Sequence, residues 1–310
     1  MSTVPTPPTL RPMSVADLVD EIFRLYRANA QILFGVCAVI WLPASIVFFI
    51  LQLTYFSNIP QFDPTRVLTP QELSDTFTDV IGALAVAFVV GVVAAPLLLA
   101  AITSVVSARY LGRPITIGAA VRRSFACYFR ILASYAVVFI VATTASIVLT
   151  IIGSILVAVI ANMVGGTIGG VIGVLLVFVI FVAAFAVFVW LITTWTLTGQ
   201  AIVIEDTGAL RSLSRSRGLV AGSRWRVIGI NILLFLIQIV LFSVPSTLVA
   251  IIAAPLPMPL GPAVSEVVTV TAQIAYFPVQ LGTLTLLYYD LRVRKEGFDL
   301  KFAAEQLAPA

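Results

Sequence analysis

Six long apolar stretches constrain the fold of this 310-residue chain more than any other feature. They lie at about residues 32–56, 80–108, 131–161, 171–204, 227–254 and 264–289. Each is at least 25 residues long, whereas about 20 residues suffice for a helix to cross a hydrocarbon core roughly 30 Å thick. Because a bilayer offers no water to the backbone, we expect helices here, since barrel strands would be shorter and alternating. The sequence therefore predicts an all-α integral membrane protein, a bundle of six transmembrane helices.

The composition argues against a soluble domain. Apolar residues make up 60% of the chain and charged residues 10%, against about 45–50% and about 25% in soluble proteins. The chain has no histidine, which excludes histidine bases, catalytic triads and imidazole metal ligands. Cys37 and Cys127 are too few for a disulfide framework, and we expect both to be small buried side chains. No metal, no cofactor and no enzymatic activity are expected.

Arginine and lysine predict the orientation. Seventeen of the 18 basic residues fall before the first stretch or after the second, fourth and sixth, and Arg66 is the exception. Under the positive-inside rule, this asymmetry predicts a plasma-membrane protein with both termini in the cytoplasm and residues 57–79 outside. The net charge is only +4, and its distribution is typical of a membrane protein and not of a nucleic-acid-binding one.

The same pattern predicts the organisation of the chain. We expect a disordered N-terminal tail, a membrane domain and a short cytoplasmic tail, over residues 1–13, 14–300 and 301–310 respectively. Amphipathic segments precede the first, third and fifth stretches, at residues 14–30, 116–130 and 207–226. We expect these segments to be cytoplasmic in-plane helices, each followed by a helical hairpin, which makes a threefold repeat.

The first amphipathic segment is the best specified of the three. Ser14 and Asp17 have the spacing of a capping box, and Leu18 and Ile22 belong to an apolar face that recurs at helical spacing. This face either lies on the membrane surface or packs against the ends of the spans, and the sequence favours neither arrangement.

Ten arginines in the two basic loops are the candidate binding residues. Each basic side chain near an anionic leaflet contributes about 1 kcal/mol to lipid binding. The alternative, which we favour, is that these charges only orient the chain during insertion. The ten residues are Arg109, Arg113, Arg122, Arg123, Arg130, Arg211, Arg215, Arg217, Arg224 and Arg226.

Two groups of acidic residues are candidates for a cation site and for a catalytic dyad. Glu72, Asp75 and Asp79 fall on one face of a predicted outer helix that begins at Thr69, and three carboxylates there could hold a hard cation. The dipole of a helix also favours acidic residues near its start, and this interpretation is preferred. The pair Glu205 and Asp206 is expected to open a helix as a cap, in preference to forming a catalytic dyad.

The C-terminal segment allows two interpretations. We expect the sixth span to end near Tyr289, where tyrosine rings favour the headgroup level. Gly297 is expected to stop the helix in a left-handed conformation. Phe298 and Leu300 would then turn back over the bundle as a clamp, or the segment is only a solvated basic flank.

Four segments carry a resemblance to a known family. They are RPMSVADLVDEIFRLYRANAQILFGVCAVIWLP, YLGRPITIGAAVRRSF, GALRSLSRSRGLVAGSRWRVIG and YYDLRVRKEGFDL. In these the chain resembles bacterial multi-pass proteins of the glycerophosphoryl diester phosphodiesterase membrane domain family. The catalytic domain of that family uses histidines and has no counterpart here, so the resemblance implies a stand-alone membrane domain.

We therefore expect a non-enzymatic membrane protein that scaffolds or regulates partners through a basic cytoplasmic face. The alternative is a transporter or lipid-handling protein, and a weaker third hypothesis is an enzyme acting on lipid headgroups. The expected partners are membrane lipids, other membrane proteins or a second copy of the chain, and no nucleic acid.

Overall fold

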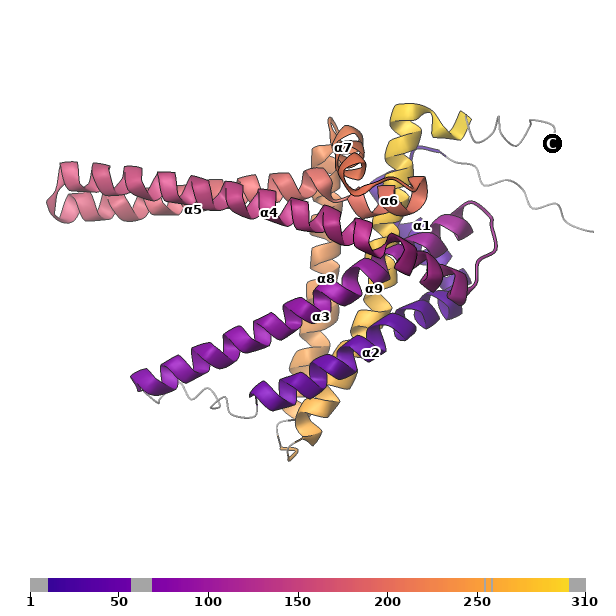
Figure 1. Ribbon diagram of the computed structural model, residues 1–310, viewed down its shortest axis with the longest axis horizontal. Helices are drawn as coiled ribbons and strands as arrows, with labels where there is room; N and C mark the ends of the chain where they lie inside the picture. Colours follow the sequence, from indigo (N-terminus) through magenta and orange to yellow (C-terminus); the bar gives the residue numbers. More distant parts are fainter. Residues whose placement is uncertain (1–10, 57–68, 254, 258, 301–310) are drawn as a thin grey trace, which may run out of the picture. The chain divides into compact units, whose positions relative to one another are not determined.

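The computed structural model describes residues 11–56, 69–253, 255–257 and 259–300. Across these ranges the chain forms nine helices and no strand (Figure 1). The helices are α1 (Val15–Ala28), α2 (Ala30–Phe56), α3 (Pro70–Tyr110), α4 (Ile117–Val164), α5 (Gly166–Trp195), α6 (Thr198–Glu205), α7 (Ala209–Val220), α8 (Arg224–Ala253) and α9 (Leu260–Glu296). Six helical segments are long and apolar enough to cross a membrane: α2, α3, α4, α5 with α6, α8 and α9. The all-α class and the six apolar helices are confirmed.

Parts of the predictions fall outside the described ranges. Arg66 lies there, as do most of the predicted N-terminal tail and the whole of the predicted tail over residues 301–310. Contacts divide the chain into two units, the first running up to Tyr128 and resuming at Ile230, and the second from Phe129 to Gly229. The two units are described separately.

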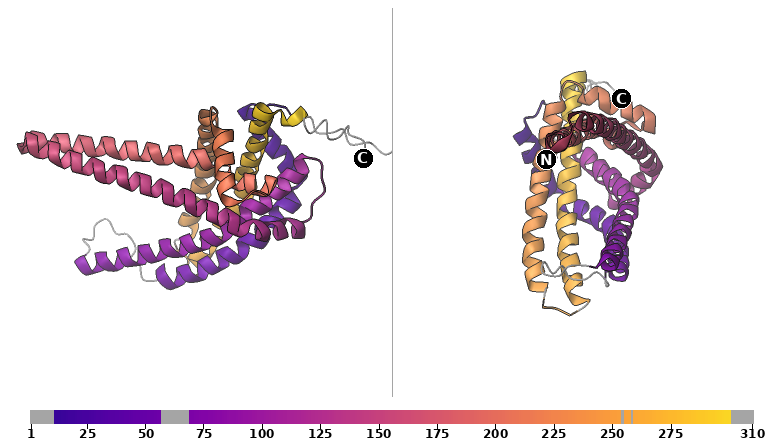
Figure 2. Two further views of the ribbon diagram at one scale, coloured as in Figure 1. Left: turned by 45° about the horizontal axis from the view of Figure 1, so that its top comes forward. Right: turned by 90° about the vertical axis from the view of Figure 1, so that its left-hand side faces the viewer.

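In the first unit, α9 is the central element. It packs against α1, α2 and α3, and α2 also packs against α3 (Figure 2). Gly282 of α9 allows a close approach, because a side chain at this position would overlap Ile22 of α1 and press on Val106 of α3. On the α8 side, the Tyr276 hydroxyl donates to the Leu234 carbonyl at 2.8 Å.

Helix α1 begins as predicted. Ser14 and Asp17 form a capping box, and the backbone hydrogen bond from Ser14 lowers the pKa of Asp17. Leu18, Ile22 and Leu25 are buried, and α1 packs on α9. Of the two arrangements that the sequence left open, the structure therefore has the apolar face of α1 packed on protein.

The end of α9 departs from the prediction at the two tyrosines. Tyr288 and Tyr289 are fully buried, whereas an anchor at the headgroup level is exposed to lipid. The Tyr289 hydroxyl lies 2.6 Å from the Ser107 hydroxyl. Helix α9 continues past these rings to Glu296 and ends at Gly297, which has φ 58° and ψ 41°. The predicted left-handed stop is confirmed, and the expectation of lipid-facing tyrosines here is wrong.

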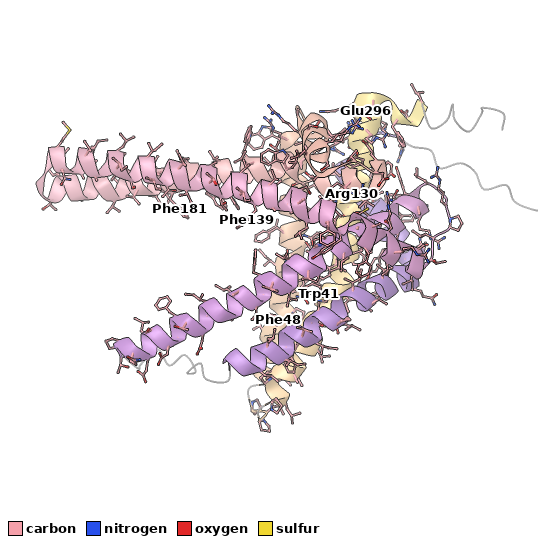
Figure 3. All side chains as sticks on the ribbon, in the orientation of Figure 1. Trp41, Phe48, Arg130, Phe139, Phe181 and Glu296 are labelled. Carbon is pink, nitrogen blue, oxygen red and sulfur yellow. The ribbon has the colours of Figure 1, made fainter. Side chains whose placement is uncertain are left out.

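The second unit contains a long helical hairpin of α4 and α5, joined at Gly165 (Figure 1). Gly153 on α4 faces Ile180 on α5 so closely that a side chain at 153 would overlap it. Outward-facing rings such as Phe139 and Phe181 are exposed (Figure 3). The segment predicted as a separate in-plane helix over residues 116–130 is the first part of continuous α4, because no glycine or proline lies between Gly118 and Gly153 to interrupt the helix.

Candidate functional site

Two short helices of the second unit, α6 and α7, are joined by a tight turn at Asp206. Asp206 ends α6 with φ 54° and ψ 35°, in the left-handed region that an aspartate adopts more readily than most residues. The prediction that Glu205 and Asp206 open a helix is wrong, because the helical run from α5 is continued by α6 up to Glu205. Gly208 then caps the start of α7.

Arg130 of α4 holds this turn in place. Its Nη2 donates to the Asp206 Oδ1 at 2.9 Å. Its Nη1 donates at 3.3 Å to the carbonyl oxygens of Asp206 and Thr207. One guanidinium therefore satisfies both the side chain and the backbone of the turn, so Arg130 has a structural role.

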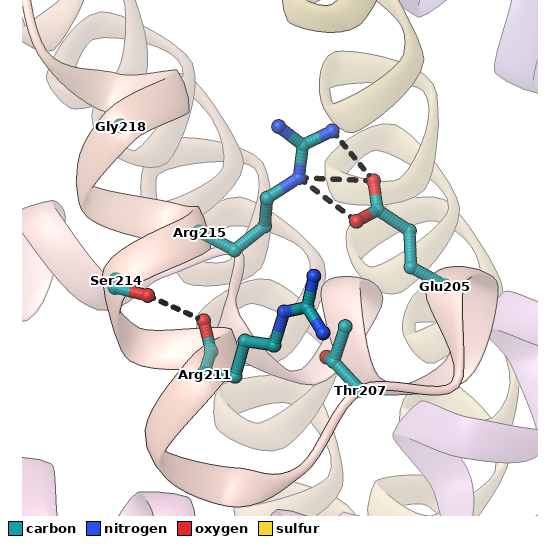
Figure 4. Close-up of a pocket in the computed structure, with 6 residues that line it drawn as sticks. All are labelled: Glu205, Thr207, Arg211, Ser214, Arg215 and Gly218. Carbon is teal, nitrogen blue, oxygen red and sulfur yellow. Dashed lines mark hydrogen bonds and ion pairs between the residues drawn. The ribbon is translucent and has the colours of Figure 1, made fainter.

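An open pocket of about 370 Å³ lies between the end of α6 and one side of α7 (Figure 4). Two arginines, two hydroxyl residues and one carboxylate give it a polar lining. The lining residues are Glu205, Thr207, Arg211, Ser214, Arg215 and Gly218.

Glu205 and Arg215 form a two-point ion pair across the pocket. Arg215 Nε donates to Glu205 Oε2 at 2.8 Å, and Arg215 Nη2 donates to Oε1 at 2.7 Å. The Arg215 side chain is 27% exposed and that of Glu205 is 20% exposed, so the pair is partly shielded from water. Such parallel contacts fix the plane of the guanidinium. The charge of Arg215 is thereby compensated.

Arg211 lies one helical turn before Arg215, and its positive charge is not compensated by a carboxylate as that of Arg215 is. Within the described ranges, its guanidinium forms no hydrogen bond or ion pair, and its side chain is exposed at the pocket (Figure 4). The Ser214 hydroxyl, which also lines the pocket, donates to the Arg211 carbonyl at 2.8 Å. With two arginines and one glutamate, the pocket carries one net positive charge and suits a small anion.

The other predicted arginines do not line this pocket. In the second unit, Arg217 is exposed elsewhere on α7, and the Arg224 guanidinium lies 4.7 Å from the centre of the Trp190 ring. In the first unit, Arg109 Nη2 donates to the Ile115 carbonyl at 3.4 Å. The remaining members of the ten are Arg113, Arg122, Arg123 and Arg226.

Two further findings concern a buried amide and the acidic residues at the start of α3. Gln200 of α6 is fully buried, and neither polar atom of its amide has a hydrogen-bond partner among the described residues. Glu72, Asp75 and Asp79 do not assemble, since the described part of the chain contains no group of three acidic, histidine or cysteine side chains placed to hold a metal ion.

One family model matches the chain over residues 65–291, almost three quarters of its length, and is described as a domain of unknown function (DUF7847). The match includes α3 to α8 and most of α9, and therefore the whole α6–α7 pocket. No curated protein and no solved structure matches the chain.

Proposed function

Because the chain belongs to the DUF7847 family of unknown function, we propose its role from the pocket itself: a non-enzymatic multi-pass membrane protein that binds the phosphate of an anionic lipid headgroup between α6 and α7. In this role the protein is a scaffold or regulatory component that senses or organises lipid on a basic cytoplasmic face.

The charge distribution supports the orientation in this proposal. Seventeen of the 18 basic residues lie before the first apolar stretch or after the second, fourth and sixth, in segments that include α1, α7 and the end of α9, and such an excess is typical of cytoplasmic segments. The pocket then lies in the plasma membrane at the level of the inner-leaflet headgroups, where anionic lipids are concentrated.

The observation that carries the proposal is the difference between Arg211 and Arg215. Arg215 is held by Glu205 at 2.7 and 2.8 Å, so it is pre-oriented but already neutralised. Arg211 contributes the uncompensated charge at the open mouth of the same pocket. A phosphate oxygen accepts from a guanidinium in a charge-assisted hydrogen bond, which is stronger than a neutral one.

The test compares Arg211→Gln with Arg217→Gln, which removes the same charge from the same helix outside the pocket. Binding of dioctanoyl phosphatidic acid to the purified full chain in maltoside detergent is measured by native mass spectrometry, with zwitterionic dioctanoyl phosphatidylcholine, which has no net charge, as the reference. We expect Arg211→Gln to weaken phosphatidic acid binding about tenfold, a change of about 1.4 kcal/mol, and Arg217→Gln to leave it within about twofold. Equal binding by the two variants would overturn the proposal.

A further inference from the structure

A second pocket, in the first unit, lies between α2 and α9 and has a different chemistry. It has a volume of about 260 Å³, and most of its lining is aliphatic or aromatic. Leu42, Ile46 and Phe49 contribute from α2, and Val267 and Val270 from α9. Nearby, Trp41 Nε1 donates to Gln273 Oε1 at 2.6 Å and joins the two helices at that level.

Glu266 is the one charged residue among the described residues that line this pocket. Its side chain is half-buried, and within the described ranges its carboxylate forms no hydrogen bond or ion pair. A carboxylate taken from water into apolar surroundings without a partner is unfavourable in its charged form, and the cost is relieved by protonation or by a counter-charge that approaches it. The unpaired carboxylate therefore favours a positively charged ligand.

The two hydroxyl residues of the lining do not supply that counter-charge, and they already have acceptors. The Ser45 hydroxyl donates to the Leu42 carbonyl at 2.9 Å, and the Thr271 hydroxyl donates to the Val267 carbonyl at 2.7 Å. Both bonds stay within one helix, as is usual for serine and threonine in membrane helices. The capacity to pair with a ligand thus rests on Glu266.

We propose that the α2–α9 pocket binds an amphipathic monocation, an ammonium group carrying an apolar chain. The ammonium pairs with the Glu266 carboxylate, and the chain lies against the aliphatic lining between the two helices. Among the described residues, the lining contains no lysine or arginine, so the phosphate of a zwitterionic lipid would find no counter-charge from them. A lining with a carboxylate but without a basic residue favours a ligand with a net positive charge over a phospholipid.

The position of Glu266 along α9 is consistent with such a ligand. It lies 24 residues before Asp290, a rise of about 36 Å along an α-helix, which exceeds the roughly 30 Å hydrocarbon core. In the topology proposed above, Glu266 is therefore near the outer headgroup boundary, where an amphipathic cation reaches it without crossing the membrane. The pocket itself does not depend on that topology.

The test follows the thermal stabilisation of the purified full chain in uncharged maltoside detergent by octyltrimethylammonium. We expect Glu266→Gln to require at least tenfold more ligand for the same shift in Tm. Asp75→Asn, which removes an exposed carboxylate of α3, should behave as wild type. Arg211→Gln should also behave as wild type, so that failure of this proposal is distinguished from failure of the lipid-phosphate proposal.

Two further ligands and one variant test whether the apolar chain of the ligand contributes to binding in the α2–α9 pocket. Tetramethylammonium, which has the charge without the chain, should stabilise the protein at least tenfold more weakly, and dioctanoyl phosphatidylethanolamine should not displace octyltrimethylammonium. Ile46→Trp, at a 58% exposed position in the lining, should block the site while leaving Glu266 in place. An unchanged response of Glu266→Gln, or equal responses to the two ammonium ions, would overturn the proposal.

Discussion

Asp290 is the most deeply buried charged side chain of α9. Hydrogen-bond donors around it compensate the negative charge of its carboxylate. The side chain has no exposed surface. Its Oδ1 accepts from the backbone N–H of Met13 at 2.7 Å, and both its oxygens accept from Arg294 Nε at 3.0 Å. Arg294 Nη2 then donates to the Met13 carbonyl at 2.7 Å. These three residues, which we call the Met13 clamp, therefore tie the start of α1 to the end of α9.

Replacement of Asp290 by asparagine should weaken the fold. Breaking a buried ion pair costs about 3–5 kcal/mol, and we expect about 3 kcal/mol of lost unfolding free energy because Arg294 is 38% exposed and partly screened by water. Thermal unfolding in detergent measures the change. Asp299→Asn, a half-buried carboxylate beyond the end of α9, is the control. Equal melting temperatures for the two variants would show that the Met13 clamp contributes nothing.

Gln200 presents the opposite case, a buried polar group left without partners. Replacing it by methionine, which has a similar size, removes an unsatisfied amide that costs about 1–3 kcal/mol. We expect Gln200→Met to raise the Tm in detergent. Gln280→Met, at a half-buried position of α9, should change it less. A lower Tm for Gln200→Met would instead mean that the buried amide binds something in the folded protein.

At the scale of elements, the turn after α9 bears on the two interpretations of the C-terminal segment. The Phe298 ring centre lies 5.7 Å from that of Tyr289, and the Arg292 guanidinium lies 4.1 Å from the centre of the Phe298 ring. Leu300 is 72% exposed. Phe298 therefore turns back onto α9 itself, whereas the clamp interpretation expects Phe298 and Leu300 to cover the ends of neighbouring spans, and Leu300 is exposed.

The variant Gly297→Val with Phe298→Asp should lower thermal stability in detergent. Valine at a positive φ costs on the order of 1–3 kcal/mol, and aspartate removes the ring from Tyr289 and Arg292. Leu300→Asp changes an exposed neighbour and should leave the Tm unchanged. If the double variant melts with the wild type while inserting normally, the segment is only a flank.

Features that depend on neighbouring residues, such as the starts and ends of helices, could be predicted from the sequence. Features that depend on residues far away in the chain, such as the burial of a side chain, could not. The capping box at Ser14, the helix start at Thr69 and the stop at Gly297 depend on a few neighbouring residues, and all three are confirmed. The burial of Tyr289 depends on α3, far away in the chain, so the preference of tyrosine for a membrane boundary gave the wrong environment.

The candidate site was predicted only as part of a larger set. Charge patterning pointed to ten arginines, because each lies in a basic loop. The distinction between Arg211 and Arg215 arises from Glu205, ten residues before Arg215, which meets it only because Asp206 turns the chain. No periodicity marks a pair across such a turn, so sequence reasoning could not separate the paired arginine from the unpaired one.

At the scale of the whole molecule, the testable property is its orientation in the membrane. Single cysteines at Arg66 and Lys295, in a chain with Cys37 and Cys127 replaced by alanine, should react with an impermeant thiol reagent from opposite sides of the membrane. Arg66→Cys should react in intact cells, and Lys295→Cys only after the membrane is opened. Labelling of both from one side would contradict the six-span topology with cytoplasmic termini.

The Met13 clamp can form only late in the synthesis of the protein. Met13 and Asp290 are separated by 277 residues, so at roughly 5–20 residues per second the ribosome needs about 14–55 s to reach the second after the first. During that time Asp290 is not yet present to accept from the Met13 amide, and every other span is made before the contact can form. A chain that stalls or is cut before the last helix lacks this closure, so the contact distinguishes finished molecules from fragments.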